Sequence, residues 1–421
     1  MSQAENQLTP EGWSNTNIGD FAPLQRGFDL PNRDRIDGNY PVVYSNGVMN
    51  FHNTYQVKGP GVITGRSGTI GKVHYVNEDY WPHNTALWVK QFNNAIPKYV
   101  YYLYTYIGFD RFSSGSGVPT LNRNDAHSFA ITVPTKKEEQ SAIANALSDV
   151  DALLTELENL IGKKQAIKTA TMQQLLTGKT RLPQFATYTE GTDEGKNKGT
   201  KPSELGEIPE DWGVQTVYEL AEGQKSLFDD GDWIEAEYIT DKGVRLIQTG
   251  NIGVGSYQEK ANKKYISESS FIKLKCKELK QGDLLICRLA EPAGRACIFP
   301  DIGEEKIITS VDVTIFRPPV ETVNREYLLH YFSTNEWFSS VLEQVGGTTH
   351  KRISRGALGR IRVPIPKLAE QTAIATILSD MDNEIQTLEQ RLAKTRQIKQ
   401  GMMQQLLTGR TRLPFKQAKE A

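Results

Sequence analysis

The sequence predicts an α+β protein: two mostly β modules separated by two long antiparallel coiled-coil helices in a pseudo-two-fold arrangement. The string MQQLLTGKTRLP at residues 172–183 returns as MQQLLTGRTRLP at residues 403–414. Each copy ends a segment with a heptad pattern, and a β-rich segment precedes each heptad segment. Because a duplicated chain closes most simply about a two-fold axis, we expect the two helices to be antiparallel partners.

The long helices are predicted from residues 139–160, EQSAIANALSDVDALLTELENL, which match residues 370–391, EQTAIATILSDMDNEIQTLEQR. Their apolar residues alternate at four and three steps, a coiled-coil seam that requires a partner helix. Each helix has about 40 residues and spans roughly 60 Å, longer than the usual core-facing helix of a globular domain. The predicted seam consists of Ile143, Leu147, Val150, Leu154, Leu157, Ile161, Ile374, Leu378, Met381, Ile385, Leu388 and Leu392.

The two modules resemble each other only weakly. Both open with Pro-Glu-x-Trp, at Pro10 and Pro209, and both close with a short strand ending in Val-Pro. Both contain a glycine-rich hairpin pattern, GVITGRSGTIGKVHYV from Gly61 and GDLLICRLAEPAGRACIF from Gly282. Short β-rich runs broken by Gly and Asn indicate mostly β modules with a few helices. The aromatic run at residues 99–109 is interpreted as one of these helices, because its large residues repeat at three to four positions.

These features give a domain order. The stretch YTEGTDEGKNKGTKPSELG is polar, glycine-rich and without periodicity, which is typical of a flexible linker. The predicted parts are a first module at 1–135, a first long helix at 136–178, a linker at 179–205, a second module at 206–365, a second long helix at 366–409 and a C-terminal tail at 410–421.

The overall composition excludes some classes. The chain has 421 residues, with 49 Lys and Arg against 50 Asp and Glu, so any nucleic-acid surface must be local. It shows neither a secretion signal nor an apolar run long enough to cross a bilayer, and we expect a soluble, cytoplasmic protein. Cys276, Cys287 and Cys297 lack CxxC spacing and are expected to be buried thiols rather than metal ligands.

The paired blocks EQxAIAxxLSDxD and QQLLTGxTRLP, the PExW openings, and SGTIGK with GSGVPTLN resemble the specificity (S) subunit of Type I restriction-modification systems. The second hairpin departs from the family's wording, because LAEP at 289–292 stands where the first has SGT. The resemblance implies two target-recognition domains, each reading half of a bipartite DNA target. It implies no catalysis by this chain, and methyltransferase, nuclease and helicase motifs are not found in the sequence.

The resemblance also implies a role in host defence. The implied partners are double-stranded DNA, two methyltransferase (modification) subunits and restriction/translocase subunits. S-adenosylmethionine, ATP and Mg are expected on those subunits, with no cofactor or metal bound here.

The stretch GRSGTIGKV is not a phosphate-binding P-loop, because five residues separate Gly65 from Gly71 and Val73 follows Lys72. A duplicated coiled-coil adaptor that binds proteins is the alternative, favoured only by the near-zero net charge.

The candidate DNA contacts are mainly basic and hydroxyl residues of the glycine-rich segments, which suit phosphate oxygens; Arg and Asn also suit base edges. Each residue alone is equally typical of a solvated loop. The candidates are Arg66, Ser67, Thr69, Lys72, Arg111, Ser114, Thr120, Asn122, Arg123, Arg288, Arg295, Thr348, His350, Lys351, Arg352 and Arg355. The candidate partner-docking residues, too polar for the seam alone, are Gln173, Gln174, Gln404 and Gln405.

Overall fold

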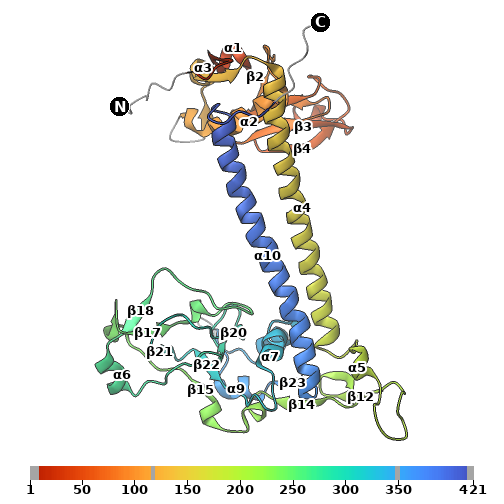
Figure 1. Cartoon of the computed structure of the whole chain (residues 1–421), viewed down its shortest axis with the longest axis vertical. Helices are drawn as coiled ribbons and strands as arrows, with labels where there is room; N and C mark the ends of the chain where they lie inside the picture. Colours follow the sequence, from red (N-terminus) through yellow and green to blue (C-terminus); the bar gives the residue numbers. More distant parts are fainter. Residues whose placement is uncertain (1–8, 115–118, 347–350, 415–421) are drawn as a thin grey trace. The chain divides into compact units, whose positions relative to one another are not determined.

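The computed structural model describes residues 9–114, 119–346 and 351–414. The chain divides into two compact units, Met1–Leu160 with Leu388–Ala421, and Ile161–Thr387. Each unit holds one module and one part of each long helix, so the units differ from the domains predicted from sequence. Figure 1 shows the chain, and each unit is described by itself below.

The first module contains a four-stranded sheet of order β2-β8-β5-β6, a three-stranded sheet of order β4-β3-β7, and the pairs β1-β11 and β9-β10. Its strands are β1 Trp13–Asn17, β2 Leu24–Arg26, β3 Tyr40–Tyr44, β4 Gly47–His52, β5 Gly61–Gly65, β6 Val73–Val76, β7 Trp81–Pro82, β8 Ala86–Val89, β9 Ser113–Ser114, β10 Thr120–Leu121 and β11 Ala130–Pro134. Its helices are α1 Ile18–Phe21, α2 Pro97–Ile107 and α3 Arg123–Ser128, with 3-10 turns η1 Asn32–Asp34 and η2 Phe109–Phe112.

The second module contains four-stranded sheets of order β15-β22-β19-β20 and β16-β18-β17-β21, and the pairs β12-β13 and β14-β23. Its strands are β12 Thr200–Ser203, β13 Gly206–Pro209, β14 Gly213–Thr216, β15 Phe228–Asp230, β16 Ile239–Thr240, β17 Val244–Ile247, β18 Lys264–Ile266, β19 Leu284–Cys287, β20 Ala296–Ile298, β21 Ile307–Thr309, β22 Val313–Phe316 and β23 Arg362–Ile365. Its helices are α6 Glu268–Leu274, α7 Arg325–Tyr331, α8 Asn335–Glu343 and α9 Arg355–Arg360, with 3-10 turns η3 Glu219–Ala221, η4 Lys225–Leu227, η5 Ala236–Tyr238 and η6 Thr249–Asn251.

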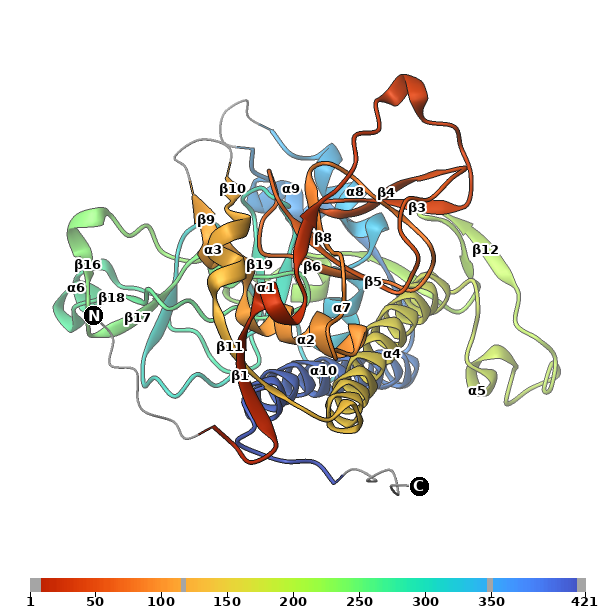
Figure 2. The ribbon, with the colours of Figure 1, turned by 90° about the horizontal axis from the view of Figure 1, so that it is seen from above.

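The strand orders of the two modules correspond. In each, an antiparallel hairpin, β5-β6 or β19-β20, forms one edge of a four-stranded antiparallel sheet, which confirms both predicted hairpins. In each, the other sheet contains one parallel pair, β3 with β7 or β17 with β21. The strand that begins at or just after the Pro-Glu-x-Trp opening pairs with the last strand of its module, β1 with β11 as Figure 2 shows and β14 with β23. The weak sequence similarity of the modules therefore hides a common topology.

Both modules require a glycine directly after one edge strand of the four-stranded sheet, Gly27 after β2 and Gly231 after β15. A Cβ atom on Gly27 would lie 2.2 Å from the carbonyl oxygen of His83, and one on Gly231 would lie 2.4 Å from that of Ser310. In both modules the next residue makes a parallel bridge to that neighbouring segment. The close approach of two backbones leaves no space for a side chain at either position.

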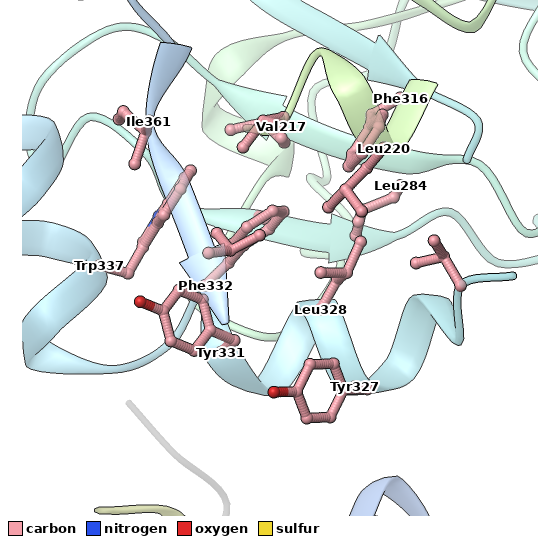
Figure 3. Packing of buried hydrophobic residues seen from close by; sticks show 14 of the residues in the cluster. Val217, Leu220, Leu284, Phe316, Tyr327, Leu328, Tyr331, Phe332, Trp337 and Ile361 are labelled. Carbon is pink, nitrogen blue, oxygen red and sulfur yellow. The ribbon is translucent and has the colours of Figure 1, made fainter. Parts of the chain in front are cut away.

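Aromatic side chains fill much of each core. In the first module, α2 buries Tyr99, Tyr102 and Tyr104, which confirms that the aromatic run is a helix packed into the module. In the second module, the rings of Phe332 and Trp337, labelled in Figure 3, stack against each other. Their centroids are 4.1 Å apart. Burying rings of this size contributes a large share of the hydrophobic stabilisation of a core.

The two long helices have the predicted position and length. Helix α4 spans Lys137–Leu175 and α10 spans Leu368–Leu406, each 39 residues. Within the first unit, α4 and α10 are joined by the ion pairs Glu158–Arg396 and Asp151–Lys399. Within the second unit they are joined by Lys164–Glu384 and Lys168–Asp382. In each unit the numbers rise along one helix as they fall along the other, so the paired segments are antiparallel.

All predicted seam residues are buried or half-buried. Those buried are Ile143, Leu147, Leu157, Ile161, Ile374, Leu378, Ile385 and Leu392, and those half-buried are Val150, Leu154, Met381 and Leu388. Near the start of α4, the seam also belongs to the core of the first module, together with Met403 and Leu406 of α10. The start of α10 is likewise part of the core of the second module, with Leu175 of α4. The seam therefore holds each module to both helices.

Each unit also contains a buried polar contact, which we call a clasp. The first clasp consists of Trp13, Glu139 and Arg412: the indole N–H donates to Glu139 Oε1 at 3.2 Å, and Arg412 Nη2 donates to Oε2 at 2.8 Å. Glu139 is 1% exposed. Its charge is therefore compensated by a residue from the far end of the chain.

The second clasp consists of Trp212, Glu370 and Arg181. The indole donates to Glu370 Oε2 at 3.1 Å, and Arg181 binds both carboxylate oxygens at 2.6 and 2.7 Å. Arg181 also donates to Asp211 at 2.9 Å. Arg181 and Arg412 occupy the same position in the two copies of the repeated string. In each unit, this string therefore meets the helix start that carries the EQ of the other repeat.

Glycines of the repeated string complete both clasps. Gly178 and Gly409 have φ angles of +71° and +70°. A Cβ atom would lie 2.4 Å from Pro209 Cδ in the second unit and 2.8 Å from Pro10 Cγ in the first. The Pro-Glu-x-Trp openings and the repeated strings are thus two sides of one contact, made twice, which supplies a reason for the repetition within the chain itself.

Residues 179–205 differ from the expected flexible linker. They contain the short helix α5 Pro183–Ala186 and strand β12, which pairs with β13. Lys198 Nζ donates to Asp211 Oδ2 at 2.8 Å, and the Gly199 amide donates to Glu210 Oε1 at 2.7 Å. The ordered structure of this segment comes from turns and from hydrogen bonds to the PEDW motif at residues 209–212. Neither kind of contact produces a hydrophobic periodicity in the sequence.

The cysteines are free thiols: Cys287 and Cys297 are buried, and Cys276 is half-buried. Burial raises the pKa of the Cys297 thiol to about 12, so it remains protonated at neutral pH. Within the described residues, we find no helix whose length and apolar character would suffice for crossing a membrane.

Candidate nucleic-acid interface

The loop of the β5-β6 hairpin carries the first group of candidates. Arg66 is half-buried, with its amide bonded to the Thr85 carbonyl at 2.8 Å and its Nε donating to the Asn84 carbonyl at 3.3 Å. Lys72 is exposed, whereas Ser67 and Thr69 are half-buried. The loop turns at Gly68 and Gly71, whose φ angles of +82° and +91° favour glycine.

A second segment lies against this loop. Ser67 forms a bridge with Thr120, and the Leu121 amide donates to the Arg66 carbonyl at 2.8 Å. Asn122 caps α3, and Arg123, which begins that helix, is exposed. The structure thereby brings Arg66 close to Thr120 and to the start of α3, although these segments are far apart in sequence.

Two other candidates of the first module lie near this group. Arg111 is exposed in η2, with its guanidinium carbon 5.3 Å from the centroid of the Phe129 ring. Ser114 lies in β9, whose backbone pairs with Thr120 of β10. Ser114 borders residues 115–118, which lie outside the described residues, and Arg111 lies three residues before Ser114.

Arg288 follows β19 as Arg66 follows β5, but it lies inside the second module. It is 1% exposed, and its guanidinium donates to the carbonyls of Ile353 and Val311 and lies 3.0 Å from Asp230. Burial lowers the pKa of Arg288, an effect that Asp230 opposes. This side chain connects segments of the module, and its guanidinium is not available to a ligand at the surface.

Arg295 also has an internal role. Its guanidinium donates to four backbone carbonyls, at Thr249, Ile252, Leu289 and Pro292, at distances of 2.7 to 3.0 Å. These bonds hold the β19-β20 loop against η6. Sequence reasoning placed Arg288 and Arg295 at the surface because basic residues in glycine-rich loops are usually solvated.

The remaining candidates of the second module surround α9. Thr348 and His350 lie outside the described residues, and Lys351 and Arg352 beside them are exposed. Arg352 Nη1 lies 3.3 Å from Asp312 Oδ1. The structure thus places these basic residues next to Leu289, which forms a bridge with Arg352.

Arg355 begins α9 as Arg123 begins α3. It is half-buried and forms ion pairs with Asp229 and Asp230. Sequence reasoning missed these aspartates, which follow one another at the end of β15. An alignment of the modules on Gly27 and Gly231 would have drawn attention to them, because the first module has Gln25 and Arg26 where the second has the two aspartates.

The four glutamines proposed for docking are exposed. Gln174 Oε1 accepts a hydrogen bond from the Thr180 hydroxyl at 2.9 Å, and Gln405 Oε1 accepts one from Thr411 at 3.4 Å. Gln404 lines a cavity of about 500 Å³ with Tyr106 and Met403. Part of the glutamine conservation between the repeats therefore has a local reason, namely bonds at the helix ends.

The fold defines a class of protein with two modules of one topology, each carrying exposed basic residues in its loops and each held to two long helices by a clasp. The family model described as Type I restriction modification DNA specificity domain matches residues 10–169 and again residues 209–397. The chain belongs to this family, and the two matches coincide with the two modules and their helices.

Among curated proteins, the chain is 28% identical over 307 residues to the Type I restriction enzyme MjaVIII specificity subunit of Methanocaldococcus jannaschii, covering 72% of this chain and 66% of that protein. It is 27% identical over 301 residues to the putative Type I restriction enzyme MjaX specificity subunit of the same organism, covering 70% and 62%. The chain thus spans less than two thirds of the length of these relatives.

Among solved structures, the S subunit of a Type I restriction-modification system from M. genitalium is similar, with a TM-score of 0.60 and 14% identity, covering 96% of this chain and 98% of that one. A chain from a Type I R-M complex structure has a TM-score of 0.53 and 14% identity, covering 96% and 100%. These similarities show a shared fold.

Proposed function

We propose that the chain is the non-catalytic specificity subunit of a Type I restriction-modification complex, in which each module reads one half of a bipartite DNA target. The observation that carries this is one topology built twice with different side chains at corresponding loop positions. A common scaffold with two unlike surfaces suits two unlike half-sites. Phosphate contacts would set the position of each module and base contacts would set its choice.

The proposed DNA contacts are the candidates with surface exposure. In the first module they are Arg66, Ser67, Thr69, Lys72, Arg111, Thr120, Asn122 and Arg123, and in the second Lys351, Arg352 and Arg355. Arg288 and Arg295 act indirectly, by holding the loops that carry these contacts. Because Lys and Arg release counterions from phosphates, binding should weaken steeply as salt increases.

The proposed partners follow the duplication. Two methyltransferase subunits would bind, one for each repeat, near Gln173 and Gln174 and near Gln404 and Gln405. Adenine methylation and DNA cleavage would be performed by the methyltransferase and restriction/translocase subunits, which would also hold S-adenosylmethionine, ATP and Mg. The specificity chain would determine the DNA sequence at which these subunits act.

The test is to map methylated adenines across a host genome with and without this gene. We expect one bipartite motif to lose its methylation. Exchanging residues 1–135 for the first module of another family member should then change one half of that motif and leave the other half and the spacer unchanged. Loss of no motif, or a swap that alters both halves, would contradict the proposal.

A further inference from the structure

One tryptophan of the second module is exposed to an unusual degree. Trp233 is 67% exposed, whereas the other tryptophans of the chain are buried or half-buried. It lies two residues after Gly231, between β15 and η5. A large aromatic side chain in solvent retains apolar surface that a ligand can cover, and such residues are often interaction sites.

The indole lines a cavity of about 240 Å³, together with Gln248, Thr249, Ser310 and Asp312. The hydroxyls of Thr249 and Ser310 make no hydrogen bond within the part of the chain that the structure describes. The cavity thus offers an aromatic face beside polar groups that can donate or accept hydrogen bonds. Base edges in a DNA groove present the same mixture, with donors, acceptors and the thymine methyl group.

Two residues that line this cavity also contact Arg352, one of the basic residues of the second module. Asp312 lines it and forms an ion pair with Arg352, and Leu289 lines it and forms a bridge with Arg352. The Arg352 side chain is 46% exposed. An arginine oriented by a carboxylate therefore contacts two residues that line the cavity together with the indole, on the surface assigned above to the second half-site.

The first module has different chemistry at the corresponding position. Two residues after Gly27 stands Asp29, which forms an exposed ion pair with Arg26 and accepts a hydrogen bond from Asn84. The indole is therefore no part of the shared scaffold. A residue that differs between the modules at the edge of a basic surface is suited to distinguishing their half-sites.

We propose that Trp233 is a specificity-determining residue of the second module, which packs its indole against a thymine methyl group in the major groove of the second half-site. The inference rests on the proposed function. The thymine methyl is the apolar group that the major groove displays, and an aromatic face covers it without a hydrogen bond. Arg352 and the cavity hydroxyls contact neighbouring base edges or phosphates.

The test uses the full chain with its methyltransferase subunits and duplex DNA carrying the motif found by methylation mapping. Trp233→Ala should lower affinity about tenfold and relax the motif at one position of the second half, in line with the cost of losing one base-pair readout. Trp233→Phe should retain most of the affinity. Ile272→Ala is the matched control, since Ile272 is 72% exposed on α6 of the same module and should leave affinity unchanged.

Replacing each thymine of the second half-site in turn by deoxyuridine removes only its methyl group. One such replacement should weaken wild-type binding and cause no further loss in Trp233→Ala. Binding of the second half-site should also shield Trp233 from a fluorescence quencher, measured as the difference between wild type and Trp233→Phe.

Normal wild-type binding with unchanged affinity and motif in Trp233→Ala would overturn this inference alone. A Trp233→Ala chain that binds DNA normally and loses its methyltransferase subunits would overturn it in favour of a protein contact. A wild-type complex that binds no duplex specifically would overturn the proposed function, and this inference with it.

Discussion

The side chains at the end of the corresponding edge strands, β2 in the first module and β15 in the second, differ between the two modules. In the first, Arg26 forms an ion pair with Asp29, and the two side chains are 54% and 67% exposed. In the second, Asp230 at the same distance before the glycine lies 3.0 Å from Arg288, whose side chain is 2% exposed. The shared topology thus fixes the backbone at this edge and leaves the charge and burial of its side chains free to change.

The contact between each module and its long helix also differs. In the first, the Tyr102 hydroxyl donates to Asp151 at 2.7 Å. In the second, His330 lies 3.2 Å from the Ser379 hydroxyl and 4.0 Å from Asp382. A lysine of the other helix binds the aspartate in both cases, Lys399 or Lys168. Only the group supplied by the module has changed, from a phenol to an imidazole.

The largest expected difference concerns the clasps. Arg181 is 11% exposed and compensates two carboxylates, whereas Arg412 is 37% exposed and compensates one. Arg181→Ala should lower the free energy of unfolding by about 3 to 5 kcal/mol, because it leaves a buried Glu370 unpaired. Arg412→Ala should cost less, because water can reach the vacated site near Glu139.

Urea unfolding measures both variants, and hydrogen exchange assigns each loss to one unit. Arg181→Lys and Arg412→Lys serve as controls that retain the charge and lose the second donor. Equal losses for the two alanine variants, or a loss in the opposite unit, would contradict the ranking of the clasps.

A second difference concerns pH. Burial lowers the pKa of His330 from 6.5 to about 4, with Lys168 acting in the same direction and Asp382 opposing. The unfolded chain therefore takes up a proton near pH 6.5 that the folded chain does not accept until about pH 4. The free energy of unfolding should fall through this window as pH decreases, by about 3 kcal/mol, and its His330 contribution should level off below it.

His330→Gln keeps a hydrogen-bonding group and cannot titrate. Its unfolding free energy, measured between pH 7 and pH 4, should show a smaller pH dependence than that of the wild type. Tyr102→Phe in the first unit is the control and should leave the slope in this window unchanged. A wild-type slope retained in His330→Gln would rule out this histidine as its source.

A third prediction tests what the modules share. Gly27→Ala and Gly231→Ala should each cost about 1 to 3 kcal/mol, because the new Cβ atom forces apart two backbones in either module. Gly162→Ala is the control: this glycine lies in α4 with nothing within 4 Å of the added atom. That variant should be stabilised by about 0.5 to 1 kcal/mol. Thermal unfolding would compare the three, and a neutral Gly27→Ala beside a damaging Gly231→Ala would break the equivalence.

The smallest effect is expected at Arg26. Its ion pair with Asp29 is solvent-exposed, so Arg26→Ala should change the unfolding free energy by less than about 1 kcal/mol. Denaturant unfolding of the variant provides the check. A loss above about 2 kcal/mol would mean that Arg26 has a structural role comparable to that of Asp230.

The sequence was sufficient for the helices and hairpins because their signals are local. The heptad pattern specified α4 and α10, and the glycine-rich patterns specified β5-β6 and β19-β20. The burial of Arg288 could not be read in this way. Its partners Asp230, Val311 and Ile353 are distant in sequence, and the surrounding residues resemble a solvated loop.

The repeated string was likewise only partly understood from sequence. Its polar glutamines suggested an external partner, which remains a prediction. The residues that the structure explains are Gly178, Gly409, Arg181 and Arg412, because their partners are the PExW openings and the first turns of the helices. A contact between two motifs so far apart leaves no periodic trace in either one.

The first clasp has a consequence for the order in which the protein is made. The second unit has its whole sequence once Thr387 has been added, whereas the first unit still lacks Met403, Leu406 and Arg412, which fill its core and its clasp. At about 5 to 20 residues per second, the N-terminal module waits tens of seconds for them after its own sequence is complete. Of the two modules, the one synthesised earlier therefore completes its core later. A chain released before Arg412 has been added would lack the first clasp and would be destabilised in the first unit.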